Sequence, residues 1–279
     1  MKQVKEYFHK LMQIIRREEL RILPGNLAFF LVLSIVPIIT LVGLICSLFS
    51  ISLVDITNLL SELIPEQVED MLTPFVSGTV NTGNLTWYFI LGFLLASNGA
   101  HSIIVASNTL YHIKNQSYLK RRVKALFLTI ILMFLFLFIL IFFAFGNVIL
   151  KFILGLKIFT SIAGKIYSIF ILLKWPIATI MIFIMIKLLY TMAPDQRISS
   201  KYVNKGAAFT TVGWLLVTAI YSYYANNVAN YNLFYGGLSG LVILMMWIYI
   251  IAYIFVIGIA INTNDYHYLE DTTVNKKEE

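Results

Sequence analysis

The chain has 279 residues, of which 59% are hydrophobic and only 13% are Asp, Glu, Lys or Arg, and its mean hydropathy is +0.82. Soluble globular domains carry about 25% charged residues, so this composition excludes an ordinary soluble domain and predicts an all-α polytopic membrane protein. The net charge of +7 does not indicate nucleic-acid binding, because the basic residues gather at the ends of apolar segments.

Residues 1–23 differ from the rest of the chain because they alternate basic and apolar residues. The apolar ones recur at helical spacing, at Val4, Phe8, Leu11 and Ile15. This pattern predicts a cytoplasmic amphipathic helix on the membrane surface, with Arg16 and Arg17 contacting anionic lipid. A leader helix that stays in water is the alternative. Pro24 and Gly25 are expected to end the helix.

Six apolar segments follow, and each is about as long, as a helix, as the roughly 30 Å hydrocarbon core is thick. We predict spans at about 27–49, 85–110, 125–150, 166–190, 206–224 and 239–262, within one transmembrane domain over residues 24–262. Short amphipathic helices in 51–84 are expected on the outer surface. Residues 263–279 are predicted to be a disordered cytoplasmic tail. Pro37 and Pro176 are expected to kink the first and fourth spans.

Lysine and arginine counts predict the orientation. With the N-terminus inside, the four inner segments hold 6, 5, 3 and 2 basic residues, whereas the three outer segments hold 0, 3 and 0. This asymmetry follows the positive-inside rule and places both termini in the cytoplasm. The three outer lysines are Lys151, Lys157 and Lys165.

The second span is the most polar of the six. Ser97, His101 and Asn108 share one face of the helix, and Asn98, Ser102 and Thr109 repeat that spacing one residue later. Such a face cannot point at lipid without cost, so we expect it to face other helices or a wet cavity. His101 could carry protons or bind a headgroup, and the alternative is a hydrogen-bonded packing residue.

Lys174 is a charged residue nine positions into the fourth span, two residues before Pro176. A charge at that depth costs about 2.5 kcal/mol or more unless it is paired, hydrated or able to snorkel. Because no acid lies inside any predicted span, a lipid phosphate would be a suitable partner. Snorkelling to the outer interface is the alternative.

Two further segments are candidates for binding anions. The turn Tyr235-Gly236-Gly237 up to Gly240 could present backbone N–H groups and a helix N-terminus to an anion. A tight turn with Gly236 and Gly240 as a helix-packing pair is the alternative. The cluster before the third span is expected to set the topology and to contact anionic headgroups; it comprises Lys120, Arg121, Arg122 and Lys124.

The last apolar segment opens with Tyr235 and Gly236, carries Trp247-Ile248-Tyr249 and closes with Gly258 and Asn262. This order resembles the last helix of the YihY/BrkB family of bacterial inner-membrane proteins. That family usually ends the helix with Gly-Ala-Glu-Leu-Asn, whereas this chain has Ala260 at the Glu position. Further positions resemble the family in order along the chain: Ser34, Pro37, Asn108, Thr109, Leu110, Tyr111, Tyr190, Pro194, Gly206, Trp214 and Tyr224.

The resemblance implies six transmembrane helices and a bacterial plasma membrane. The family has been associated with envelope integrity, virulence and lipid handling, and it once carried the label of a ribonuclease. The residues do not favour that label, because metal-dependent ribonucleases need clustered His and Asp. The four histidines here are far apart in sequence, at His9, His101, His112 and His267.

We therefore expect a protein that transports or flips an amphipathic anion such as a phospholipid. It is not expected to be an enzyme, to need a cofactor or metal, or to bind nucleic acid. The sequence has no phosphate-binding Gly-Lys-Ser/Thr loop, so we do not expect an ATP-driven pump. The alternative is a scaffold without transport activity that organises envelope-synthesis proteins. A homo-oligomer, the substrate and the direction of movement stay open at this stage.

Overall fold

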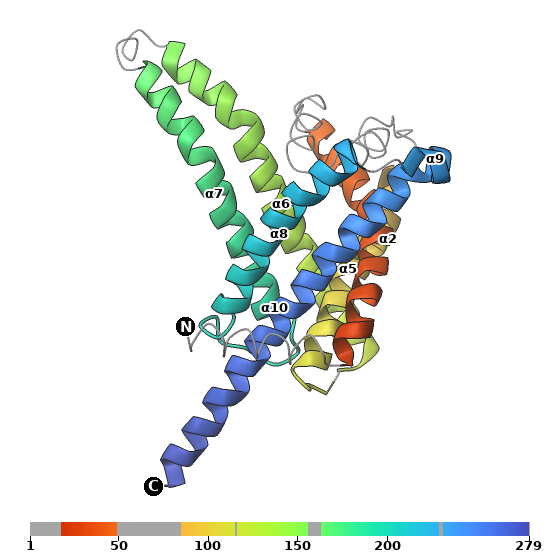
Figure 1. Cartoon of the computed structure of the whole chain (residues 1–279), viewed down its shortest axis with the longest axis vertical. Helices are drawn as coiled ribbons and strands as arrows, with labels where there is room; N and C mark the ends of the chain where they lie inside the picture. The colour runs from red at the N-terminus through yellow and green to blue at the C-terminus, as the bar shows by residue number, and fades with distance from the viewer. Residues whose placement is uncertain (1–17, 49–84, 115, 156–162, 229–230, 279) are drawn as a thin grey trace.

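The structure is a computed structural model that describes residues 18–48, 85–114, 116–155, 163–228 and 231–278. The described residues fold into helices without a strand (Figure 1). The long helices are α2 (Glu19–Leu48), α5 (Leu85–Leu110), α6 (Tyr118–Gly155), α7 (Ala163–Met192), α8 (Asn204–Asn227) and α10 (Ser239–Glu278). The short α9 (Tyr231–Tyr235) and η3 (Gly236–Leu238) precede α10. Each of the six predicted segments is thus a long helix, which confirms the all-α fold class.

Four of these helices are long and apolar enough to cross a membrane within the described part of the chain. The candidate spans are Glu19–Leu41, Ile90–Leu110, Trp175–Met192 and Ser239–Thr263. Their lengths and compositions show a multi-pass membrane protein. The spans expected in α6 and α8 stay predictions, and the outer helices expected in 51–84 lie outside the described residues.

Pro24 and Gly25 do not end a helix, so the predicted boundary at residue 23 is wrong. They lie inside α2, which begins at Glu19 and also contains Pro37. Proline removes only one backbone hydrogen bond, and packing on both sides can hold the helix together. Leu20 and Leu27 supply that packing, since both are almost fully buried. Residues 1–17, with Arg16 and Arg17, lie outside the described residues.

The tail predicted to be disordered is also helical, because α10 continues from Ser239 to Glu278. No proline or glycine follows Gly258, and a helix that has already formed extends at the cost of only one residue at a time. The extension projects beyond the other helices in Figure 1.

The bundle is organised around α10, which packs against α2 and α8, while α5 lies between α2 and α6. Small residues let α2 and α5 approach closely. A Cβ atom on Gly99 would lie 3.2 Å from Ser34 Oγ. The Ser34 hydroxyl accepts a hydrogen bond from the Gly99 N–H at 2.9 Å and lies 3.3 Å from the Leu95 carbonyl oxygen. Ser34 therefore contacts both ends of one turn of α5.

The closest helix approach lies between α8 and α10. A Cβ atom on Gly206 would overlap the Gly258 carbonyl oxygen, and one on Gly258 would overlap the hydroxyls of Thr210 and Tyr190. Gly236 does not contribute to this kind of packing. It lies in η3, before α10 begins, with φ +51° and open space around it, so it serves the turn.

Candidate functional site

The polar face of α5 points into the protein, as predicted. Ser97 and Asn108 are fully buried and Ser102 is 5% exposed, while Asn98 and His101 are half-buried. The Ser97 hydroxyl donates to the Leu94 carbonyl at 2.7 Å. The face therefore meets neighbouring elements along most of its length.

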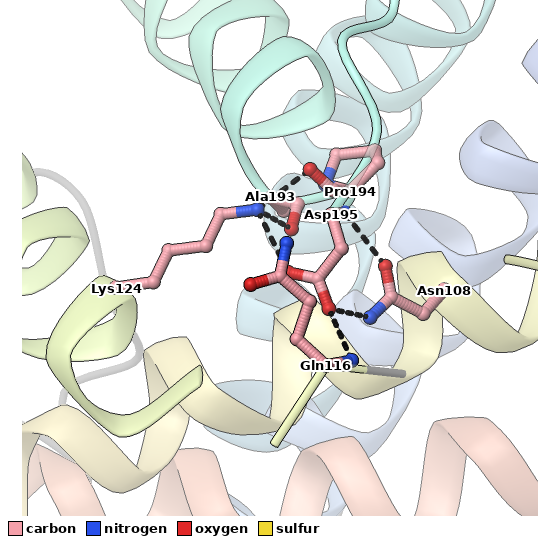
Figure 2. A network of polar contacts seen from close by, with 6 residues as sticks. All are labelled: Asn108, Gln116, Lys124, Ala193, Pro194 and Asp195. Atoms are coloured by element: carbon pink, nitrogen blue, oxygen red, sulfur yellow. Dashed lines mark hydrogen bonds and ion pairs between the residues drawn. The ribbon is translucent and has the colours of Figure 1, made fainter. Parts of the chain in front are cut away.

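Asn108 connects the end of α5 to the loop after α7. Its Nδ2 donates to Asp195 Oδ2 at 2.7 Å, and its Oδ1 accepts from the Asp195 backbone N–H at 2.8 Å (Figure 2). A reversal of the chain just after Asn108 positions it, because Ile113 N–H donates to the Asn108 carbonyl and His112 has φ 54°. This is the helix ending known as a Schellman motif. Any ligand at Asn108 would have to displace Asp195.

Lys124 completes this network from α6. Its ammonium donates to the carbonyl oxygens of Ala193 at 2.8 Å and Pro194 at 2.6 Å, and it pairs with Asp195 Oδ1 at 3.2 Å (Figure 2). These contacts use all three N–H donors of a lysine. The acceptors lie just past the end of α7, where a cation is favoured by the exposed carbonyls and the helix dipole.

Asp195 stays charged in this network. Burial raises the pKa of its carboxyl group, but hydrogen bonds from the Gln116 N–H, Asn108 and Lys124, together with the Lys124 charge, lower it more, so that the pKa lies below its usual value. The side chain is only 2% exposed. Asp195 therefore ties α5 and α6 to the α7–α8 loop.

Arg122, two residues before Lys124, points at α5 instead. Its Nη1 donates to Asn98 Oδ1 at 2.7 Å, and its Nη2 donates to the Leu94 carbonyl at 2.8 Å. Asn98 and Leu94 precede Leu110, the end of α5, by 12 and 16 residues, or about 18 and 24 Å at 1.5 Å per residue. Measured along α5, the guanidinium is therefore level with the middle of that helix, although Arg122 itself is only the fifth residue of α6.

His101 and Arg121 lie beside this contact. The rings of His101 and Tyr118 meet edge to face with centroids 5.9 Å apart. The charges of Arg121 and Arg122 are close enough to act on the His101 imidazole. His101 Nε2 and Arg121 Nε are both buried and have no hydrogen-bond partner among the described residues. We call Asn98, His101, Tyr118, Arg121 and Arg122 the basic seam.

The other predicted site residues lie elsewhere where the structure describes them. Lys174 lies in α7 near Pro176, but its side chain is outside the described part of the structure. Tyr235, Gly236 and Gly237 lie in α9 and η3, with Gly240 in the first turn of α10. Lys120 is exposed. Within the described ranges, no group of three or more His, Cys, Asp or Glu could hold a metal ion.

Comparison with known sequences identifies the family. The sequence model of the family described as "Virulence factor BrkB" matches residues 12–279. The chain belongs to the BrkB family. Its relatives include "Putative ribonuclease-like protein YfkH" of Bacillus subtilis, 28% identical over 85% of this chain and 87% of the relative. UPF0761 membrane proteins of Vibrio campbellii and Psychromonas ingrahamii are each 24% identical, over 90% and 99% of this chain and 79% and 95% of the relatives. No solved structure matches significantly.

Several residues that carried the resemblance to the BrkB family lie together where α7, α8 and α10 meet. The Tyr190 hydroxyl donates to the Phe255 carbonyl at 2.8 Å and lies 2.6 Å from Thr210 Oγ1. Asn262 Oδ1 accepts from the Gly206 N–H at 2.8 Å. These residues form a packing junction, and sequence spacing alone could not bring them together.

Ala260, at the position where the BrkB family usually has Glu, is fully buried. The sequence analysis did not single out Asp195. The one signal beside it was Pro194, which is among the positions that resemble the BrkB family.

Proposed function

We propose that this BrkB-family protein binds an amphipathic anion, with a phospholipid as the leading class, and moves it across the membrane. The observation that supports the proposal is the Arg122 guanidinium at the level of the middle of α5. Its partners there, Asn98 and the Leu94 carbonyl, are neutral and satisfy hydrogen bonds without balancing the charge.

The energetics favour an anionic ligand. An arginine without a counter-charge is costly where water is excluded, by about 2.5–3.5 kcal/mol at the bilayer centre on insertion scales and by less towards the interface. Neither Arg121 nor Arg122 has an acidic partner among the described residues. A phosphate group carried by a lipid would balance these charges, because arginine pairs with phosphate through two parallel hydrogen bonds.

Vesicles test the proposal directly. Purified protein is reconstituted with head-group-labelled phosphatidylglycerol, and the label is quenched from outside. We expect quenching beyond that of protein-free vesicles, reduced at least about tenfold in rate by Arg122→Gln, because the substituted side chain carries no charge. Arg197→Gln, at an exposed loop arginine, is the matched control and should keep the wild-type rate.

Two further variants keep this test interpretable. Arg122→Lys keeps the charge and should retain more activity than Arg122→Gln at equal folded yield. Lys174→Leu asks whether the lysine in α7 is part of the same route, and a loss of movement in that variant would extend the site to α7. Unchanged movement in folded Arg122→Gln protein, or no movement by the wild type, would refute the proposal and favour the scaffold alternative.

A further inference from the structure

The basic seam contains two buried nitrogen atoms without partners, one on each of two facing helices. His101 Nε2 belongs to α5 and Arg121 Nε to α6, and neither has a hydrogen-bond partner among the described residues. Leaving a buried polar group unpaired costs about 1–3 kcal/mol, and more when the group is charged. Two such atoms within one pair of packed helices point to a position that an external acceptor could fill.

The register of the two helices explains why these groups meet. Tyr118, Arg121 and Arg122 lie three and four residues apart, so they share one face of α6. Asn98 and His101 are three residues apart on α5 and share a face in the same way. The Arg122–Asn98 hydrogen bond joins the two faces, and the Tyr118–His101 ring contact joins them again one turn away. Arg121 directly precedes Arg122 in this part of α6, and its charge acts on His101.

The charge of the seam suits an anion with two negative charges. Arg121 and Arg122 contribute two guanidinium groups from the same part of α6, and the His101 imidazole can donate a hydrogen bond from Nε2 when that nitrogen carries the proton. The first turn of α6 begins at Tyr118, and its N–H groups and dipole favour negative charge in the same place. A phosphomonoester carries a charge of about −1.5 to −2 at pH 7, because its second pKa is near 6, whereas a phosphodiester carries only one charge.

The surroundings of the seam suit a lipid. Leu119 and Val123 on α6 are 75% and 66% exposed, and Leu95 on α5 is 52% exposed. These apolar side chains flank the basic residues on both helices, so acyl chains could lie against them while the headgroup reaches the guanidinium groups. A free phosphate would gain nothing from this apolar surface.

We propose that Arg121, Arg122 and His101 form a binding site for a phosphomonoester dianion, the headgroup chemistry of phosphatidic acid and other lipid monophosphates. This inference rests on the proposed function and adds the class of headgroup that the site prefers. Phosphodiester lipids are weaker ligands of the same seam.

Binding measurements on the purified full-length chain at pH 8 test the inference. The probes are dioctanoyl phosphatidic acid, dioctanoyl phosphatidylglycerol and inorganic phosphate. The affinity of each is measured by titration calorimetry in detergent. We expect phosphatidic acid to bind about tenfold or more tightly than phosphatidylglycerol. Arg121→Gln and, from the other helix, His101→Gln should each reduce that preference severalfold, whereas Arg197→Gln, at the exposed arginine of the α7–α8 loop, should leave it within about twofold.

The possible outcomes distinguish a lipid ligand from a soluble phosphate. They also distinguish failure of this inference from failure of the proposed function. Inorganic phosphate as tight as phosphatidic acid would assign the site to soluble phosphates rather than lipids. Equal affinity for the two lipids, or an unchanged preference in folded Arg121→Gln protein, would overturn the inference. If phosphatidylglycerol still crosses vesicles in that case, the proposed function stands alone. Selective binding of phosphatidic acid without lipid movement would support the binding site and refute the proposed transport.

Discussion

Asp195 lies in the loop after α7, and its carboxylate accepts from Asn108 and the Gln116 N–H while it pairs with Lys124. Because the side chain is 2% exposed, its charge depends on these donors. The carboxylate that joins three parts of the chain is therefore also the group whose protonation would separate them.

Protonation of Asp195 is expected to destabilise the protein in acid. The folded-state pKa is lowered, so the stabilisation is fully present above the ordinary value near 3.9 and is lost as the pH falls through the folded-state pKa. At pH 7, Asp195→Asn should lower the free energy of unfolding by about 1.5–3 kcal/mol. Thermal unfolding in detergent should show that the stability difference between the wild type and Asp195→Asn becomes smaller below about pH 4. Glu18→Gln, at an exposed carboxylate, should be as stable as the wild type. A stability difference for Asp195→Asn that does not change with pH would contradict the charged state assigned to Asp195.

Gly206 offers a second test on a single residue. A Cβ atom there would overlap the Gly258 carbonyl, whereas a Cβ atom on Gly25 would meet nothing within 4 Å. Gly206→Ala should cost about 1–3 kcal/mol through overpacking and should lower the apparent melting temperature. Gly25→Ala, also within a helix, should be neutral or stabilising by up to about 1 kcal/mol. Equal changes in stability for the two substitutions would show that helix propensity, and not the close packing at Gly206, determines the effect.

Between elements, α8 and α10 are joined by side chains that donate to backbone carbonyls of α10. Trp214 Nε1 donates to the Ile251 carbonyl at 3.0 Å, and the Tyr221 hydroxyl donates to the Ile243 carbonyl at 3.0 Å. Trp247 Nε1 of α10 donates to Thr218 Oγ1 at 3.2 Å in the opposite direction. These bonds fix the register along α8 where the apolar packing of a membrane bundle would allow sliding.

Tyr190 connects α7 to α8 and α10. Removing its hydroxyl tests how much these contacts stabilise the packing of the three helices. Tyr190→Phe should lower the free energy of unfolding by about 1–2 kcal/mol, because the hydroxyl contacts both Thr210 and the Phe255 carbonyl. Tyr223→Phe, on an exposed residue of α8, is the control and should have no effect. An equally stable Tyr190→Phe protein would show that glycine packing alone holds the junction.

For the whole molecule, six long helices place the α5–α6 and α7–α8 connections at one end of the bundle. The Asn108–Asp195 contact joins those two connections, and α6 and α7 lie side by side as they leave that end (Figure 1). The distribution of Lys and Arg predicts that this end is cytoplasmic.

Cysteine labelling checks the orientation. The chain has one cysteine, Cys46, which is first replaced by serine. Ser199→Cys, in the exposed α7–α8 loop, should react with a membrane-impermeant maleimide only after the membrane is opened. Asn226→Cys, exposed at the far end of α8, should react in intact cells. The reverse pattern would invert the topology, and equal labelling in intact cells would contradict the predicted fifth span.

The helices agree with the predicted elements to different degrees. The bounds of α5 and the start of α10 agree with prediction, because uninterrupted apolar segments of bilayer length leave the backbone little choice but a helix. The break at Pro24 and the end at residue 262 were wrong, because both rest on local signals that the continuity of the helix overrides. For the candidate site, His101, Arg121 and Arg122 were named separately, but nothing in the sequence predicted that they would meet.

The sequence by itself determined the number of long helices, their approximate bounds and their membrane character, because each depends on the composition of one continuous segment. Only the tertiary structure decided which polar groups meet. Asp195 pairs with Asn108 across 87 residues, Gly206 with Asn262 across 56, and Arg122 with Asn98 across 24. A hydrogen bond forms only when its atoms come within about 3 Å, and that distance depends on how the helices pack and cross.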